Sequence, residues 1–299
     1  MKNKLVRGIW PALVTPFTDD GSAFAKDHVY PLTTHLLDSG ANGFFVTGST
    51  GEGASMLPKE RKAMVETTVS CVSNQVPLII QVGACPTSTA MELARHAIRA
   101  GADAIATVAP TDHPNNLQAA VKHYKAIGGA TNAPFYVYWV AQTAEENVDA
   151  EQFLEAMKSV PNFSGIKFTD FNFYLFQRLV SIAGDQLNII SGPDEMCLGA
   201  MVAGADAAIG STYNIMPKMF LQMRNYFEES KIDPAMKLQD QANSVISAMM
   251  QYDFFGSLKG ILTARGYCVG PPRSPHNTLS VHNLNNLLSK LDNLDFEIE

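Results

Sequence analysis

The sequence predicts an α/β fold, a (β/α)₈ barrel followed by a C-terminal helical extension, and three observations lead to it. First, a glycine among small residues ends a helical pattern and opens an apolar run at 39–43, 100–104 and 203–207. Glycine accepts the left-handed conformation that ends a helix, so each site is expected to turn from helix to strand. Second, the apolar runs are continuous, as in parallel strands covered on both faces. Third, no GxGxxG or phosphate-loop fingerprint follows the first run, which disfavours an open doubly wound sheet.

Strand-like runs and helical patterns alternate along most of the chain. The expected strands are residues 9–16, 43–47, 77–83, 104–110, 134–140, 163–168, 187–191 and 207–211. The helical patterns between them are residues 28–38, 58–73, 87–100, 116–128, 150–160, 171–183 and 195–203. Eight such units in one chain indicate a closed TIM barrel.

Four more helical patterns follow the eighth expected strand, at 217–229, 233–250, 257–265 and 279–291. We interpret the first as the eighth barrel helix and the others as an extension that ends in an acidic tail, 292–299. No low-complexity linker separates them. The expected organisation is therefore a catalytic barrel over 1–230 and a helical extension of the same domain over 231–299.

The composition restricts the partners and the compartment. The 299 residues are 46% hydrophobic and 17% charged, as in ordinary globular proteins. A net charge of −7 with scattered basic residues disfavours nucleic acid and anionic membranes as partners. No apolar run approaches the roughly 18 residues of a membrane span, and no signal core follows the first residues. We therefore expect a cytoplasmic protein that binds a small molecule.

The four cysteines are Cys71, Cys85, Cys197 and Cys268. They lie far apart and form neither a CxxC motif nor a Cys/His ligand spacing. The sequence therefore predicts reduced, buried thiols, with no metal site.

A barrel of this kind carries its chemistry where the strands run into the following loops. The sixth strand places Lys167 in an otherwise apolar run, whereas most other lysines fall on predicted helices. Burial disfavours an ammonium and leaves more neutral amine to attack a carbonyl, so Lys167 is a candidate for imine formation. The alternative is a strand-end lysine that snorkels out of the barrel or pairs with Asp170.

The second strand runs into Thr-Gly-Ser-Thr-Gly-Glu-Gly at 47–53. The backbone N–H groups and the hydroxyls of Ser49 and Thr50 could surround an anion such as a carboxylate. The alternative is a glycine-rich turn with polar filler.

The fifth strand places Tyr136 and Tyr138 on one side, because side chains alternate along a strand. Tyr138 is nearer the C-terminal end and beside the sixth strand, so its phenol could reach a group bound to Lys167. A tyrosine there is more often a core residue than a catalyst. His113, after the fourth strand, is the reserve candidate for proton transfer, because imidazole titrates near neutrality.

The last two strands end in polar motifs, Ser-Gly-Pro-Asp-Glu at 191–195 and Gly-Ser-Thr-Tyr-Asn at 210–214. They place Asp194, Glu195 and further hydroxyls at the same rim. The two carboxylates could instead cap the helix that follows, where negative charge at the first turn is favourable.

Together these motifs resemble the class I pyruvate aldolases of the N-acetylneuraminate lyase and dihydrodipicolinate synthase superfamily. The resemblance runs from Gly-Ile-Trp-Pro-Ala at 8–12 to Gly-Pro-Pro-Arg at 270–273 and includes Gly-Ile-Lys at 165–167. It implies that Lys167 forms the imine and that Tyr138 shuttles protons. It also implies that Ser49 and Thr50 hold the carboxylate of the keto acid, that no cofactor is needed, and that the protein is a homotetramer.

Within the superfamily the sequence is more similar to the neuraminate lyases. In synthases an arginine after the strand-five tyrosine holds the second substrate, and residues 139–144 contain none. Buried sugar hydroxyls need many polar partners. The resemblance implies that these partners are Thr169, Gly192, Asp194, Glu195 and Ser211. We therefore expect cleavage of N-acetylneuraminate to pyruvate and N-acetylmannosamine.

Three alternatives stay open. The first is a lyase or dehydratase for another 2-keto-3-deoxy sugar acid, and the second is a dihydrodipicolinate synthase. The third is a non-catalytic sugar-acid binding protein. Trp139 and His113 motivate it, because they stand where the family usually has Asn-Ile-Pro and an aromatic pair.

Overall fold

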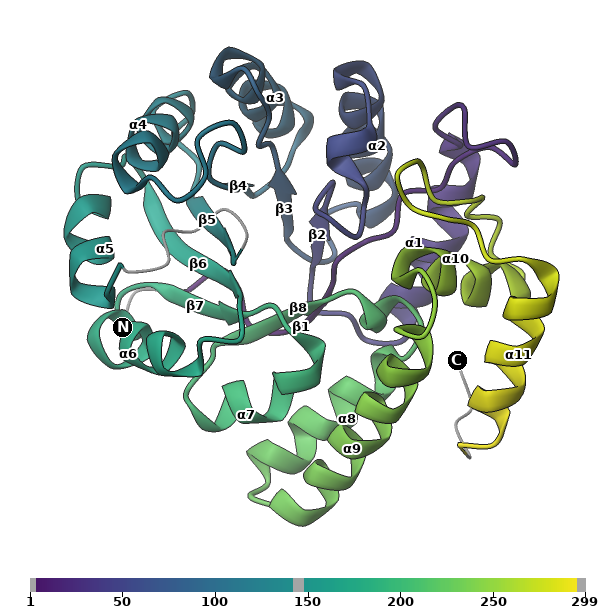
Figure 1. Cartoon of the computed structure of the whole chain (residues 1–299). Coiled ribbons are helices and arrows are strands. Elements are labelled where there is room, and N and C mark those ends of the chain that lie inside the picture. Colours follow the sequence, from purple (N-terminus) through teal and green to yellow (C-terminus); the bar gives the residue numbers. More distant parts are fainter. Residues whose placement is uncertain (1–3, 142–147, 295–299) are drawn as a thin grey trace.

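Eight parallel strands form a ring that helices surround (Figure 1). The structure is a computed structural model that describes residues 4–141 and 148–294. Hydrogen bonds connect the strands in the order β1-β8-β7-β6-β5-β4-β3-β2. The ring closes between β1 and β2 through an isolated bridge between Ala12 and Phe45 and a 2.9 Å bond from Leu13 N to Phe45 O. The predicted (β/α)₈ barrel is therefore confirmed.

Every predicted strand is present, and most are shorter than the apolar runs. The second one, for example, stops before Thr47, whose φ of 56° lies in the left-handed region and starts the following turn. The strands are β1 (Gly8–Pro11), β2 (Phe44–Val46), β3 (Leu78–Gln81), β4 (Ala104–Thr107), β5 (Phe135–Val140), β6 (Phe163–Thr169), β7 (Asn188–Ser191) and β8 (Ala207–Gly210).

The predicted barrel helices also occur. Gly40, Gly101 and Gly204 have φ values of 97°, 109° and 97°, so the three repeated motifs are turns from helix to strand, as predicted. The helices are α1 (Val29–Asp38), α2 (Pro58–Val72), α3 (Thr87–Ala100), α4 (Leu117–Gly128), α5 (Ala150–Met157), α6 (Phe173–Ala183), α7 (Cys197–Val202) and α8 (Pro217–Glu228). Short 3₁₀ turns include η2 (Gly53–Ser55), η3 (Asp194–Met196) and η4 (Thr212–Asn214).

Three helices form the C-terminal extension: α9 (Ile232–Met249), α10 (Phe254–Ala264) and α11 (Val281–Asp292). The side chain of Gln239 on α9 accepts a hydrogen bond from Leu198 N at 2.9 Å and donates one to Asp194 O at 3.1 Å. The extension is therefore tied to the loop that follows β7. Of the expected acidic tail, residues 295–299 lie outside the described part of the chain.

The cysteines only partly match the expectation. All four are free thiols, but only Cys197 is buried, while Cys85 and Cys268 are exposed. The prediction of buried thiols was wrong for these two, because both lie in loops at the surface rather than in strands or helices. No helix within residues 4–141 and 148–294 is long and apolar enough to cross a membrane.

Candidate active site

A cavity of about 370 Å³ lies at the C-terminal ends of the strands. Four of its lining residues come from the extension, namely Ile246, Met250, Phe254 and Phe255, and the sequence analysis missed them because they are apolar and far from the strands. The cavity also brings together every predicted site residue: Lys167, Tyr138, Ser49, Thr50, Thr169, Gly192, Asp194, Glu195 and Ser211.

Lys167 is only 4% exposed, and its side chain points into the barrel. Its Nζ lies 4.1 Å from the ring centroid of Tyr138 and 4.4 Å from that of Phe45, so two aromatic faces hold it. The snorkelling alternative is therefore wrong. So is the pairing with Asp170, whose carboxylate instead accepts hydrogen bonds from Trp139 Nε1 at 3.1 Å and Asn172 N at 3.0 Å. Within the described part of the chain, no carboxylate lies at ion-pair distance from this amine.

Tyr138 is the register partner of Lys167 on the neighbouring strand. Its hydroxyl lies 3.1 Å from Ser49 Oγ. Burial raises the pKa of the phenol, but the charge of Lys167 and the bond with Ser49 outweigh burial and leave the pKa below its ordinary value. Tyr136, two residues earlier, lies deeper and donates to Asn188 Oδ1 at 2.9 Å. Of the two tyrosines, only Tyr138 lines the cavity.

The turn at residues 47–53 is tightly built around Ser49 and Thr50. A Cβ on Gly53 would lie 2.0 Å from Thr47 O, so only glycine fits there. Thr15 Oγ1 donates to Gly51 O at 2.7 Å and fixes the turn to the loop after β1. The turn therefore has a defined geometry, and Ser49 and Thr50 both line the cavity.

A pair of hydroxyls from the turn after β2 and the end of β8 meets at the cavity wall. Thr50 Oγ1 lies 2.7 Å from Ser211 Oγ, and either atom can donate. Together with the Ser49 and Tyr138 hydroxyls, this pair gives the cavity several hydrogen-bond donors near the Lys167 amine. Such donors suit a carboxylate or a hydroxyl of a ligand.

Two buried polar atoms line the cavity: Asp194 Oδ1 has no hydrogen-bond partner among the described residues, and Thr169 Oγ1 has only the Tyr138 phenol nearby, whose pKa it helps to lower. Each lies against a glycine. A Cβ on Gly192 would lie 1.9 Å from Thr169 Oγ1, and a Cβ on Gly210 would lie 1.9 Å from Asp194 Oδ1. The glycines thus leave room for these polar groups, and a polar ligand would satisfy them, since buried groups rarely stay unpaired.

Asp194 does not cap the following helix. Its Oδ2 accepts hydrogen bonds from Thr212 N at 2.8 Å and Thr212 Oγ1 at 2.7 Å, both beyond the end of β8. Asp194 and Glu195 do lie in the first turn of η3, as the capping alternative expected, but the Asp194 side chain bonds to the loop after β8 and forms no capping hydrogen bond. Burial raises the pKa of this carboxyl to about 7, the Thr212 bonds oppose the rise, and the charge of Glu195 adds to it.

The two residues that suggested a binding protein lie away from the cavity. Trp139 packs outward, with its ring stacked on Phe168 at 5.7 Å and edge-on to Phe153 at 5.2 Å. His113 is on the surface, with 63% of its side chain exposed and Nδ1 3.4 Å from Asp112 Oδ2. Neither lines the cavity, so neither has displaced Tyr138 from it. Of the segment 139–144, residues 142–144 lie outside the described residues.

The arrangement can perform amine and proton chemistry on a carbonyl compound. A buried primary amine, a phenol with a lowered pKa and clustered hydroxyls are the groups that imine formation and acid–base catalysis use. In residues 4–141 and 148–294, no group of three or more His, Cys, Asp or Glu side chains could hold a metal ion.

Comparison with known proteins gives one family. Residues 5–294 match the dihydrodipicolinate synthetase family. The N-acetylneuraminate lyase of Proteus mirabilis is 30% identical with a TM-score of 0.92, over 99% of this chain and 100% of that one. The native N-acetylneuraminate lyase of Aliivibrio salmonicida is 28% identical, with a TM-score of 0.92 and 98% of both chains covered. CdNal of Clostridium difficile, solved with mannosamine, is 26% identical with a TM-score of 0.91, over 97% of this chain and 99% of that one.

Proposed function

Because the chain belongs to the dihydrodipicolinate synthetase family and is a carbon–carbon lyase, we propose that it cleaves a 2-keto-3-deoxy sugar acid through an imine on Lys167. The proposed substrate is N-acetylneuraminate, and the products are pyruvate and N-acetylmannosamine. The observation that carries the proposal is the buried Lys167 amine, which faces a phenol at the base of a hydroxyl-lined cavity.

The reaction begins with attack of the neutral Lys167 amine on the C2 ketone, followed by loss of water to give an iminium. The two rings beside Nζ shield the nitrogen from bulk water, and their faces stabilise the positive charge of the iminium that forms there. Ser49 and Thr50, in the tight turn after β2, hold the carboxylate of the keto acid beside the amine.

Cleavage moves the electron pair of the C3–C4 bond into the iminium and forms an enamine. Tyr138 supplies the proton that leaves with the water when the iminium forms, and the resulting phenolate then accepts the proton of the C4 hydroxyl, so that C4 leaves as an aldehyde. A phenol whose pKa is lowered gives up its own proton more readily, so it can act as this base. Protonation of the enamine at C3 and hydrolysis of the imine then release pyruvate and restore Lys167.

The sugar end of the substrate lies toward β6, β7 and β8 in this proposal. Asp194 Oδ1 is buried without a partner, Thr169 Oγ1 is buried beside the Tyr138 phenol, and sugar hydroxyls would pair with both. Glu195, Ser211 and the backbone at Gly192 line the same wall. CdNal, solved with mannosamine, supports an amino sugar as the aldehyde.

The choice of N-acetylneuraminate is tested against the synthase reaction. The segment after Tyr138 has no arginine in residues 139–144 to hold a second carboxylate. Cleavage of N-acetylneuraminate should therefore be much faster than condensation of pyruvate with aspartate semialdehyde, measured side by side. Equal or faster condensation would support the synthase instead. Release of pyruvate from a panel of other 2-keto-3-deoxy sugar acids identifies the preferred substrate.

The imine is tested directly by borohydride reduction in the presence of pyruvate. Reduction should attach the carbons of pyruvate irreversibly to one lysine, and mass spectrometry of the digested protein should locate them on Lys167. An adduct on another lysine would contradict the assignment, and no adduct at all would favour a simple binding protein.

We further propose that the protein is a cytoplasmic homotetramer. The resemblance to the pyruvate aldolases supports the tetramer, and the four free thiols suit a reducing compartment. Sedimentation equilibrium measures the assembly state, and a monomer at micromolar concentration would contradict the first part. Fractionation of cells tests the second.

A further inference from the structure

Four buried or half-buried charges cluster behind the turn at residues 47–53, away from the reacting amine. Two are carboxylates near α2, Glu52 and Glu60, and two are cations from the C-terminal part of the chain, Lys259 and Arg273. Both cations lie over the ring of Phe17, each 4.1 Å from its centroid. The cluster therefore joins the loop after β1, the turn after β2 and the C-terminal extension.

Glu52 is the member of the cluster that belongs to the turn. One of its oxygens pairs with Lys259 Nζ at 2.6 Å, and the other accepts a hydrogen bond from Arg273 N at 2.6 Å. Lys259 is only 2% exposed, and burial lowers its pKa to about 8, although Glu52 opposes the shift and Arg273 adds to it. A buried ammonium is costly unless it is paired, so the Glu52 contact is what Lys259 needs.

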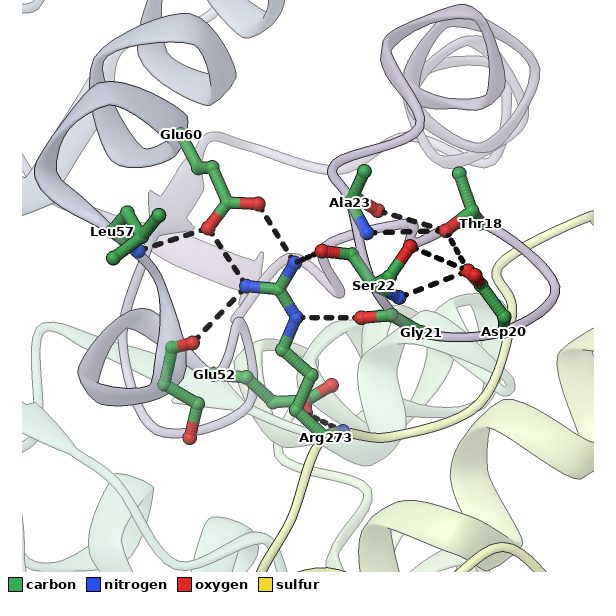
Figure 2. Close-up of polar contacts among 10 residues, drawn as sticks. Thr18, Asp20, Gly21, Ser22, Ala23, Glu52, Leu57, Glu60 and Arg273 are labelled. Carbon is green, nitrogen blue, oxygen red and sulfur yellow. Dashed lines mark hydrogen bonds and ion pairs between the residues drawn. The ribbon is translucent and has the colours of Figure 1, made fainter.

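Arg273 secures the same region from the other side (Figure 2). Its guanidinium forms a two-point contact with Glu60 at 2.7 and 2.8 Å. It also donates to the backbone oxygens of Gly21 and Ser55 at 2.9 and 3.1 Å. Because the guanidinium is planar and has several partners, both its position and its orientation are fixed, so Arg273 is a rigid support for this region.

The turn needs such support because its backbone is strained. Thr47 and Glu52 have φ values of 56° and 51°, in the left-handed region that non-glycine residues rarely adopt. Strained residues persist only when their surroundings hold them. Glu52 N also donates a hydrogen bond to Ser49 O at 2.9 Å, so a displacement of the Glu52 backbone would move Ser49.

We propose that Lys259 and Arg273 are positioning residues, which act through Glu52 to hold Ser49 and Thr50 in the geometry that binds the substrate carboxylate. The proposal rests on the proposed function. The C-terminal extension then contributes to affinity for the keto acid even though neither cation touches the ligand. Loss of the Lys259 charge should weaken binding of a carboxylate and leave the chemistry of Lys167 intact.

The test compares pyruvate with acetone, a methyl ketone that lacks the carboxylate. Borohydride trapping on Lys167 is measured against ketone concentration for the wild type and Lys259→Met. The concentration of pyruvate for half-maximal trapping should rise at least about tenfold, the equivalent of one lost hydrogen bond to a charged group. The value for acetone and the maximal trapping rate should change little, whereas general damage to the site would change both ketones.

Lys4→Met is the matched control. Lys4 pairs with Asp206 at 2.7 Å, but at the opposite end of the barrel, so its loss should leave both trapping curves unchanged. If Lys259→Met does not fold, the double variant Glu52→Gln/Lys259→Met removes both charges and should show the same selective loss for pyruvate. A folded Lys259 variant with the wild-type pyruvate curve overturns the proposal. Absence of trapping in the wild type overturns the proposed function instead.

Discussion

Lys167 and Tyr138 are register partners on β6 and β5, and the lysine Nζ lies 4.1 Å from the centroid of the tyrosine ring. The phenol oxygen in turn lies 3.1 Å from Ser49 Oγ in the turn after β2. Three strands of one barrel thus bring an amine, a phenol and a hydroxyl together. The first two predictions separate the roles of the amine and the phenol.

Lys167→Arg should reduce turnover to background while the protein stays folded. A guanidinium remains protonated and cannot form an imine, but it can still rest between the rings of Phe45 and Tyr138. Pyruvate release and thermal unfolding are the two measurements. Lys158→Arg, on the surface, is the control and should keep full activity. Substantial turnover by the Lys167 variant would remove the imine from the mechanism.

Tyr138→Phe should slow cleavage by about 10² to 10⁴, the usual effect of losing a general acid–base group. Imine formation with pyruvate should persist, because Lys167 is untouched. Tyr136→Phe is the matched control, because it also removes a buried hydroxyl, the one that donates to Asn188, and it should cost stability rather than turnover. His113→Ala should be fully active, given its exposed position. A collapse in the histidine variant with a normal Tyr138 variant would reverse the assignment.

Asp194→Asn should change how stability depends on pH. The folded-state pKa of Asp194 is raised from 3.8 to about 7, so between these values the folded protein keeps a proton that the unfolded chain releases. This group therefore stabilises the folded wild type fully below pH 3.8. That stabilisation is lost as the pH rises through about 7, where the folded protein also releases the proton.

An asparagine at position 194 does not titrate. The difference in urea midpoint, variant minus wild type, should therefore become larger between about pH 5 and about pH 8. Asp233→Asn, at an exposed position on α9, controls for the loss of a carboxyl. A constant difference across this range would show that Asp194 is ionised in the folded protein throughout.

Gly192→Ala should disturb the sugar side of the cavity. The added Cβ would lie 1.9 Å from Thr169 Oγ1 and 2.8 Å from its Cα, so rotation of the threonine side chain cannot relieve the clash. We expect a loss of about 1–3 kcal/mol in the free energy of unfolding and a higher KM for the sugar acid. Gly199→Ala on α7 is the control, since its Cβ would meet only the Phe173 ring at 3.9 Å. Equal effects of the two substitutions on KM would contradict this account.

The arrangement of the site was largely predictable from the sequence. Parallel strands in a barrel end at one rim, so polar residues at the ends of different strands must meet there. That rule alone identified Ser49, Tyr138, Lys167 and Asp194 as neighbours at one rim, although they are far apart in the chain. It says nothing about burial, however, and both snorkelling and capping were reasonable until the contacts of Lys167 and Asp194 were known.

The contribution of the C-terminal extension was not predictable in the same way. Glu52 and Lys259 are separated by more than 200 positions, and no periodicity links a helix of the extension to a turn after the second strand. Phe254 and Phe255 look like ordinary core residues of a helix. Their place at the cavity depends on how α10 packs, which is a tertiary property.

The closure of the ring has a consequence for how the protein is made. β1 pairs over four residues with β8, but its connection to β2 is an isolated bridge between Ala12 and Phe45 and one hydrogen bond from Leu13 N to Phe45 O. During synthesis, the first strand therefore lacks its main hydrogen-bonding partner until residue 210 has left the ribosome. The partners of Glu52, Lys259 and Arg273, are synthesised later still. The turn at residues 47–53 thus gains these two partners only late in synthesis, and a ribosome stalled before residue 259 would carry a barrel in which Glu52 has neither of them.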